Sequence, residues 1–167
     1  AAEYAVRFVA RLMELREHLK NRAPTDSRFE PPWTTLSVGR ISGGVAHNVI
    51  VGKAEVDWEM RPVQAADLAF VNDNMQQYIH DTLIPAMRQV YPAADISTEI
   101  IAEICGLDPM PENAARQLVS ELTGANSADL VAFGTEAGLF QGLGLSAVVC
   151  GPGSIAQAHK PDEYVAL

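Results

Sequence analysis

Residues 53–61 read Lys-Ala-Glu-Val-Asp-Trp-Glu-Met-Arg, so that charged and apolar side chains alternate along the stretch. Successive side chains of a β-strand point to opposite faces, and the stretch therefore predicts a strand with one wet face and one buried face. We expect this strand to begin at residues 48–51. A second alternation at 34–41 predicts a preceding strand, and the glycines of residues 42–44 predict a turn.

Helical periodicity flanks this pair of strands. Apolar side chains recur at helical spacing over residues 3–21 and again over 65–90, where we expect Pro85 to kink the helix near its end. Residues 95–104 alternate once more and predict a third strand. The resulting order is helix, strand, strand, helix, strand. One further strand ahead of the first helix would give the βαββαβ order of a ferredoxin-like α+β sandwich, so we expect a fragment that lacks the first strand.

The chain changes character at residues 106–111, which are rich in proline and glycine. We place a domain boundary there, with residues 1–106 as the ferredoxin-like domain and 107–167 as part of an α/β domain. Short, continuous apolar runs are typical of strands that are covered on both faces of such a sheet. The elements expected in the second domain are a helix at 112–123 and strands at Leu130–Phe133 and Leu145–Cys150.

The composition is that of a globular protein: 167 residues, 48% hydrophobic, with a net charge of −9. An acidic chain is poorly suited to phosphate, so we expect no nucleic acid partner. The uncharged stretch 137–159 is interrupted by glycines and Pro152, so we expect no membrane span. Cys105 and Cys150 lie in apolar surroundings, which predicts buried free thiols and a reducing, cytoplasmic location.

Two places in the second domain have residues suited to chemistry. His159 follows a predicted buried strand and precedes the helix start that Pro161 predicts, where α/β sheets bind ligands. A histidine there suits a metal ligand, a general base or an ordinary polar residue before a helix. Gly134, Thr135 and Glu136 follow the other apolar run, and their amides, hydroxyl and carboxylate suit an anion or a cation. A glycine turn with a solvated acid is the alternative.

The first domain has a third candidate place, on the long strand. Asn48 stands where we expect this strand to open, and Arg61 stands at its end on the polar face. Arginine is the side chain best suited to bind a carboxylate through two hydrogen bonds. An ordinary solvated, charge-balanced strand face is the alternative.

Five motifs in a fixed order carry a resemblance to a known family. They are Gly43-Gly44-x-Ala46-x-Asn48-x-Ile50, Asp57-x-x-x-Arg61-Pro62, Gly134-Thr135-Glu136-Ala137-Gly138, Cys150-Gly151-Pro152-Gly153-Ser154 and Ala158-His159-Lys160-Pro161-Asp162-Glu163-Tyr164. Together they resemble the acetylornithine deacetylase family of the zinc aminoacylase/carboxypeptidase superfamily, which also contains succinyl-diaminopimelate desuccinylase. One departure is Val51, where that family commonly has proline.

The resemblance implies a two-domain subunit. A catalytic α/β domain would hold two zinc ions, with cobalt as an alternative metal, and an inserted ferredoxin-like lid domain would form a homodimer. Residues 1–106 would be most of the lid, and residues 107–167 would be the C-terminal part of the catalytic domain.

The resemblance also assigns roles to individual residues of this chain. They are His159 as a metal ligand, Asn48 and Arg61 as groups that hold the substrate carboxylate (often across the dimer), Gly134 and Thr135 as a substrate-contacting loop, and Glu136 as a contact to the amino side chain of an ornithine-like substrate. The family's other metal ligands, its general-base glutamate and a lid histidine would come earlier in the complete protein. We therefore expect this chain alone to be inactive.

The implied activity is that of a metal-dependent amidohydrolase of arginine biosynthesis, which converts N2-acetyl-L-ornithine to ornithine and acetate. Other hydrolases of the superfamily are alternatives: a desuccinylase, a carboxypeptidase or a carbamoyl-amino acid hydrolase. A non-catalytic ferredoxin-like binding or dimerisation module is an alternative of another class.

Overall fold

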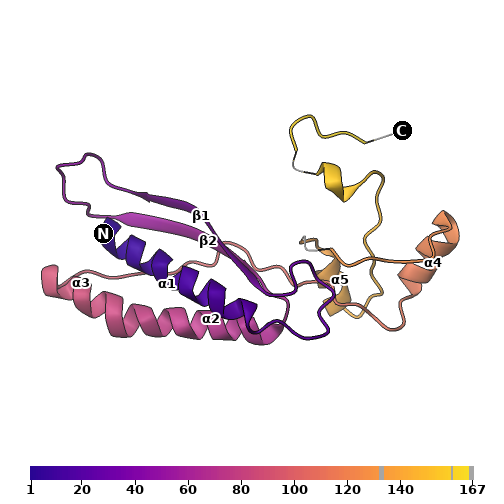
Figure 1. Cartoon of the computed structure of the whole chain (residues 1–167), viewed down its shortest axis with the longest axis horizontal. Coiled ribbons are helices and arrows are strands. Elements are labelled where there is room, and N and C mark those ends of the chain that lie inside the picture. The colour runs from indigo at the N-terminus through magenta and orange to yellow at the C-terminus, as the bar shows by residue number, and fades with distance from the viewer. Residues whose placement is uncertain (132–133, 159, 166–167) are drawn as a thin grey trace. The chain divides into compact units, whose positions relative to one another are not determined.

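The computed structural model describes residues 1–131, 134–158 and 160–165. These residues form two compact units (Figure 1). Unit 1 contains residues 1–99 together with Leu130 and Val131, and unit 2 contains the other described residues. The domain boundary expected at residue 106 stays a prediction.

Unit 1 begins with the predicted order of helix, strand, strand and helix. Its elements are α1 (Ala2–Lys20), β1 (Thr35–Gly43), β2 (Ala54–Arg61), α2 (Ala65–Tyr78), a π-helical turn η1 (Ile79–Leu83) and α3 (Ile84–Val90). The ends of α1 suit the helix dipole, because Glu3 lies in the first turn and His18 and Lys20 lie in the last. Both helices and both strands predicted for residues 3–90 are therefore confirmed, apart from their exact bounds.

Among the described residues, the strands form a two-stranded antiparallel sheet. Its register runs from the pair Thr35 and Arg61 to the pair Gly43 and Ala54, with a β-bulge at Gly39. One apolar cluster joins α1, β1 and α2. Its buried members are Leu12, Leu15, Leu19, Leu36, Val71 and Met75, and Val38, Trp58 and Met60 of the sheet pack against them. The apolar side of the alternating strand pattern is thus the side that meets the core, as predicted.

The second long helix is interrupted just before Pro85. The backbone N–H of Ile84 donates to the carbonyl of Ile79, five residues back, which is the hydrogen bond of a π-turn. Proline has no N–H to donate, and its ring crowds the preceding turn of a helix. A π-turn just before Pro85 accommodates the proline within the helix. The kink expected at Pro85 stays a prediction. Tyr4 of α1 donates from its hydroxyl to the carbonyl of Ala86 at 3.2 Å and holds α3 in place.

Two strand predictions in the first hundred residues are wrong. Residues 48–51 belong to the turn region between β1 and β2 rather than to β2, since the turn opens with Gly44 in the left-handed conformation (φ 87°). Residues 95–104 are described throughout and form an extended chain without a ladder, because no described strand pairs with them. Ile96 packs against the cluster of Ile79, Leu83 and Ile84, whereas Ile101 is 84% exposed.

Unit 2 contains α4 (Ala114–Thr123), α5 (Ala137–Gly142) and a short 3₁₀ helix, η2 (Ile155–Gln157). The helix predicted at 112–123 is confirmed, and both its ends have a local cause. The Asn113 side chain accepts a hydrogen bond from the N–H of Arg116, and Gly124 ends the helix in the left-handed conformation.

The strands and the second helix start predicted for residues 107–167 are wrong where the described residues test them. Residues 145–150 and the described part of 130–133 are not strands, and Leu145 is 52% exposed. Strands of this kind need at least one neighbouring strand and cover on both faces, and the described residues of unit 2 contain no strand. Residues 132 and 133 lie outside the described residues. Pro161 lies in a turn rather than at a helix start, and Asp162 beside it has φ 59°.

Two further expectations concern solvent and membrane. Cys105 and Cys150 are free but exposed, so the expectation of buried thiols is wrong, because the apolar runs that hold them are not packed into a sheet. In the described part of the chain, no helix combines the length and the apolar character needed to cross a membrane.

Candidate functional site

The hairpin of β1 and β2 determines where Asn48 and Arg61 lie. Asn48 is exposed in the turn region that joins the strands, whereas Arg61 is the last residue of β2 and pairs with Thr35, the first residue of β1. The seven residue steps from Ala54 to Arg61 span about 23 Å at the usual rise of a strand. The structure therefore places the two predicted carboxylate ligands at opposite ends of the hairpin and does not bring them together within one chain.

The Arg61 side chain extends from the sheet into solvent. It is 57% exposed, and its guanidinium contacts the Glu59 carboxylate at 3.2 Å through Nε and at 3.1 Å through Nη2. An exposed ion pair of this kind contributes little stability. The geometry suits an anion-binding arginine at the rim of unit 1.

The same face of the hairpin holds a network of charges between the two predicted ligands. Arg40 binds Asp57 at 2.8 Å and Glu55 at 3.1 Å, and Lys53 binds Glu55 at 2.6 Å. The hydrogen bond from Lys53 lowers the pKa of Glu55, and the hydrogen bond to Asp57 raises the pKa of Arg40. The polar face of the strand is balanced in charge, and Asp57 of the second motif forms an ion pair with Arg40.

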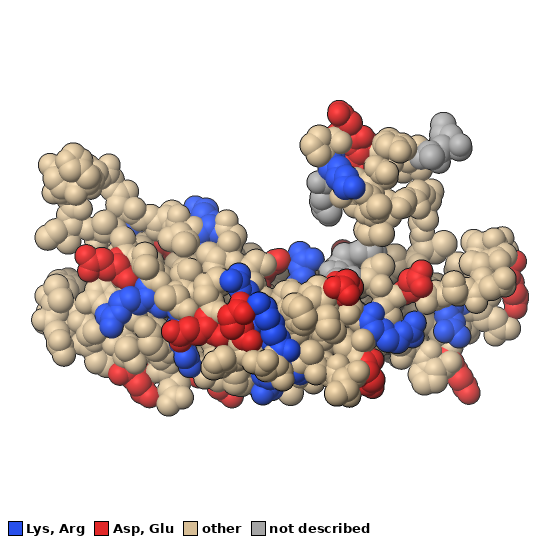
Figure 2. Space-filling model, viewed as in Figure 1, with Lys and Arg blue, Asp and Glu red and all other residues tan. Residues whose placement is uncertain are grey.

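The turn of the hairpin has a different character. Residues 43–52 include no charged side chain, and Val45 and Ile50 are 89% and 97% exposed. The same region is uniformly tan in Figure 2, where it forms the tip between β1 and β2 of Figure 1. Asn48 therefore stands on a neutral, exposed tip, whereas Arg61 stands at the charged base of the hairpin.

The loop of Gly134, Thr135 and Glu136 leads into α5 in unit 2. The Thr135 hydroxyl accepts a hydrogen bond from the N–H of Ala137 at 3.1 Å, which starts the helix. Glu136 is exposed at the N-cap position. Gly138 in α5 packs so closely on the carbonyl groups of Cys105 and Gly106 that a Cβ there would clash with them. The close packing of Gly138 therefore fixes where this loop ends.

No metal centre is formed by the described residues, because no three His, Cys, Asp or Glu side chains among them lie close enough to hold an ion. The predicted metal ligand, His159, lies outside the described residues. The described residues therefore do not supply the ligands that the implied pair of zinc ions would need.

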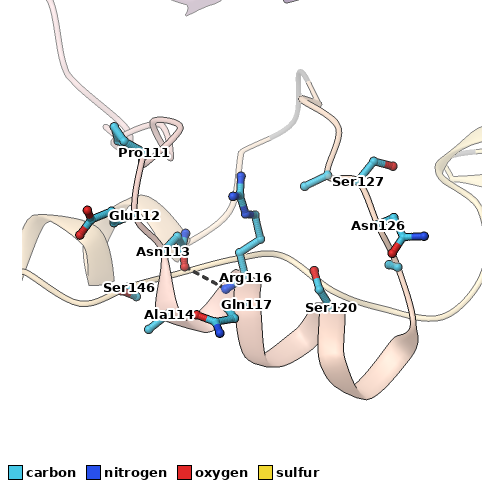
Figure 3. A pocket seen from close by; sticks show the side chains of 12 residues that line it. Pro111, Glu112, Asn113, Ala114, Arg116, Gln117, Ser120, Asn126, Ser127 and Ser146 are labelled. Carbon is cyan, nitrogen blue, oxygen red and sulfur yellow. Dashed lines mark hydrogen bonds between the residues drawn. The ribbon is translucent and has the colours of Figure 1, made fainter.

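A shallow hollow beside α4 is the clearest concavity found in unit 2. Figure 3 shows Arg116 projecting from α4 into the space that Ser127 borders on the other side. Its lining is polar and open, and it includes none of the predicted site residues. Asn113 lies at its edge but already accepts the hydrogen bond that caps α4. The hollow therefore adds no chemistry to the candidate site.

The sequence analysis did not predict a buried cluster of hydrogen-bonded side chains around Asp67 in unit 1. The side chains of Asp67 and Thr34 are 1% and 0% exposed and bind each other at 2.6 Å. A signal for this cluster was present in the sequence. Asp67 stands four residues before Val71 and eight before Met75, so an acid occupies the buried stripe of α2.

The described part of unit 1 is thus an antiparallel hairpin packed on two helices, with Arg61 exposed at the end of β2. The profile of the peptidase dimerisation domain of the M20 peptidases matches residues 1–87. The chain belongs to this family.

Curated relatives extend the similarity past the dimerisation domain. The chain is 34% identical over 157 residues to an acetylornithine deacetylase of Klebsiella pneumoniae, and 33% identical over the same length to enzymes of that name from Salmonella heidelberg and Salmonella arizonae. Each alignment covers 94% of this chain but only 39% of the relative. The recognised family resemblance is confirmed, and the chain spans about two fifths of the length of these relatives.

Proposed function

We propose that a longer protein containing this chain removes the acetyl group from N2-acetyl-L-ornithine and releases ornithine and acetate. The observation that carries the proposal is the identity of 33–34% to enzymes named acetylornithine deacetylase across 94% of the chain. The similarity runs well beyond residues 1–87 and so extends into unit 2. Within that enzyme, residues 1–106 would form the homodimer and residues 107–167 would complete the catalytic domain.

Arg61 would bind the α-carboxylate of the substrate. A guanidinium donates two parallel hydrogen bonds to a carboxylate, which fixes the orientation of the substrate as well as its position. The exposure of Arg61 supports this role. The remaining roles proposed for unit 2 are substrate contact for Gly134 and Thr135, contact with the substrate's amino side chain for Glu136, and metal coordination for His159.

Asn48 and Arg61 can share one substrate only if they come from different copies of the chain. The length of the hairpin separates them within a copy, and membership of a dimerisation family supports a second copy. A mixture of the Asn48→Ala and Arg61→Ala variants of the complete protein should then recover activity above either variant alone. Recovery that never exceeds the average of the two variants would contradict a shared site.

The completion of the fold is part of the same proposal. Among the described residues, β2 pairs only with β1, and the cluster of Ile79, Leu83 and Ile84 is covered by Ile96 rather than by a strand. We propose that a strand from outside residues 1–167 pairs with the second edge of β2, as the ferredoxin-like order expected from the sequence requires.

The decisive experiment is an assay of the complete protein on a panel of N-acyl amino acids. We expect the highest kcat/KM for N2-acetyl-L-ornithine, with N-succinyl-diaminopimelate, N-carbamoyl amino acids and dipeptides as the competing classes. A higher value for any competitor would replace the proposed substrate within the same superfamily. Hydrolysis of none of them in the presence of zinc or cobalt would favour a non-catalytic dimerisation module instead.

The 167-residue chain provides a separate test of whether the metal site lies outside its residues. It should hydrolyse no acetylornithine and should not bind zinc tightly at a fixed stoichiometry, because its described residues gather no ligand set. Sedimentation equilibrium measures whether it dimerises. Tight, stoichiometric zinc binding in a calorimetric titration would contradict the assignment of the metal site to residues outside the chain.

A further inference from the structure

The end of β2 rests on a buried polar cluster that the proposed function does not use. The Asp67 carboxylate accepts hydrogen bonds from the Thr34 hydroxyl at 2.6 Å, from Nε of Arg22 at 2.9 Å and from Nε2 of Gln64 at 3.1 Å. Gln64 also donates to the carbonyl of Arg22 at 3.0 Å. Both Asp67 and Thr34 are almost completely buried. The cluster thus ties together the loop after α1, the start of β1 and the first turn of α2.

The Thr34 hydroxyl links this cluster to the backbone beside Arg61. It has a single proton, which it gives to Asp67, and its oxygen accepts the N–H of Val63 at 2.9 Å. Val63 lies two residues after Arg61, and Pro62 between them has a fixed φ. Arg61 itself is paired in register with Thr35 on the neighbouring strand. The backbone around Arg61 is therefore held by two adjacent residues, by Thr35 through strand pairing and by the Thr34 hydroxyl through the N–H of Val63.

We propose that Thr34 and Asp67 are positioning residues for Arg61, through the hydrogen bonds from Val63 to Thr34 and from Thr34 to Asp67. The proposal rests on the proposed function, in which Arg61 holds the substrate carboxylate. A flexible, exposed side chain can orient a carboxylate only if its backbone is fixed, and Arg61 is the last residue of its strand, where strands otherwise fray. The buried carboxylate of Asp67 orients the threonine hydroxyl, and the hydroxyl fixes the backbone that follows Arg61.

Paired substitutions separate positioning from simple packing. Thr34→Val keeps the volume of the side chain but removes the hydroxyl, whereas Thr34→Ser keeps the hydroxyl. The matched control is Tyr4→Phe, which removes another hydroxyl that binds a backbone carbonyl of unit 1, that of Ala86. If the hydroxyl positions Arg61, Thr34→Ser behaves like the wild type and Thr34→Val does not.

In the complete protein, we expect Thr34→Val to raise the KM for N2-acetyl-L-ornithine roughly tenfold. The KM for the α-carboxamide of the same substrate, which cannot pair with Arg61, should stay unchanged in that variant. Adding Thr34→Val to Arg61→Ala should cause no further rise. An equal rise in KM for both substrates, or an equal rise in the Tyr4→Phe control, would show that Thr34 is only structural and would overturn the proposal.

A readout that does not depend on activity is amide hydrogen exchange in the 167-residue chain. The N–H of Val63 should exchange faster in Thr34→Val but not in Thr34→Ser or Tyr4→Phe, and unchanged exchange in Thr34→Val would overturn the proposal. The proposed function fails separately: an unchanged KM in Arg61→Ala would remove Arg61 from the site. If Arg61→Ala raises the KM and Thr34→Val does not, the role of Arg61 stands and the positioning proposal alone falls.

Discussion

Replacing Asp67 by alanine should destabilise unit 1 by about 2–4 kcal/mol, and the structure indicates where this loss arises. The Thr34 hydroxyl is fully buried and gives its proton to Asp67, so the variant leaves a buried donor without its acceptor, at a cost of ~1–3 kcal/mol. The Arg22 side chain is 36% exposed and can turn to water, so its lost ion pair adds only about 1 kcal/mol. The higher helix propensity of alanine roughly offsets the lost interaction of the carboxylate with the α2 dipole.

The assay is urea unfolding of the 167-residue chain followed by tryptophan fluorescence. Both tryptophans, Trp33 and Trp58, lie in unit 1, so the signal reports this unit even if unit 2 unfolds separately. The matched control is Asp73→Ala, an exposed acid on the same helix, which should shift the free energy of unfolding by less than about 0.5 kcal/mol. If Asp67→Ala shifts it no more than the control does, the cluster does not stabilise the fold and the reasoning is refuted.

Three further predictions use other contacts. In the complete protein, Arg61→Ala should raise the KM for N2-acetyl-L-ornithine and strongly lower kcat/KM, and steady-state kinetics would remove Arg61 from the site if kcat/KM stayed unchanged. The hydrogen bond from Lys53 lowers the pKa of Glu55 below its ordinary 4.5, so its stabilising effect is present above that pH and is lost as the pH falls through the lowered pKa. Melting temperatures between pH 3 and 7 should therefore fall less steeply for Glu55→Gln than for the wild type, whereas parallel curves would show that the pair contributes nothing. Gly138→Ala should lower the melting temperature of unit 2, because the added Cβ meets the Cys105 carbonyl, and an unchanged circular dichroism melt would contradict that contact.

The sequence predicted unit 1 best where each local pattern had its partner nearby. The alternation at 53–61 and the periodicity of α1 and α2 gave the right elements because the β1–β2 hairpin and the helices that cover it bury one another. The alternation at 95–104 is equally regular, but alternation describes only the faces of a strand and says nothing of its edges. Since residues 95–104 pair with neither β1 nor β2, the alternating pattern was insufficient to predict a strand, and the chain stays extended.

The predictions for unit 2 failed for a related reason. Apolar runs such as 145–150 indicate strands only when a sheet covers both their faces, and in this unit they are exposed. The prediction of α4 succeeded because its causes are local: Asn113 caps the start and Gly124 ends the helix. Capping depends on neighbours three or four residues away, whereas a parallel sheet depends on strands far along the chain.

The candidate site shows the same division between local and distant causes. An arginine at the end of a strand, beside a glutamate, is an ordinary surface feature, and Arg40 also pairs with a carboxylate of β2. What distinguishes Arg61 is the backbone behind it, which is bonded through Val63 and Thr34 to a buried carboxylate from another element. Binding groups gain precision from such rigid support rather than from their own side-chain contacts. For the role proposed for Arg61, the buried polar groups beneath its backbone therefore mark the residue better than its own charge does.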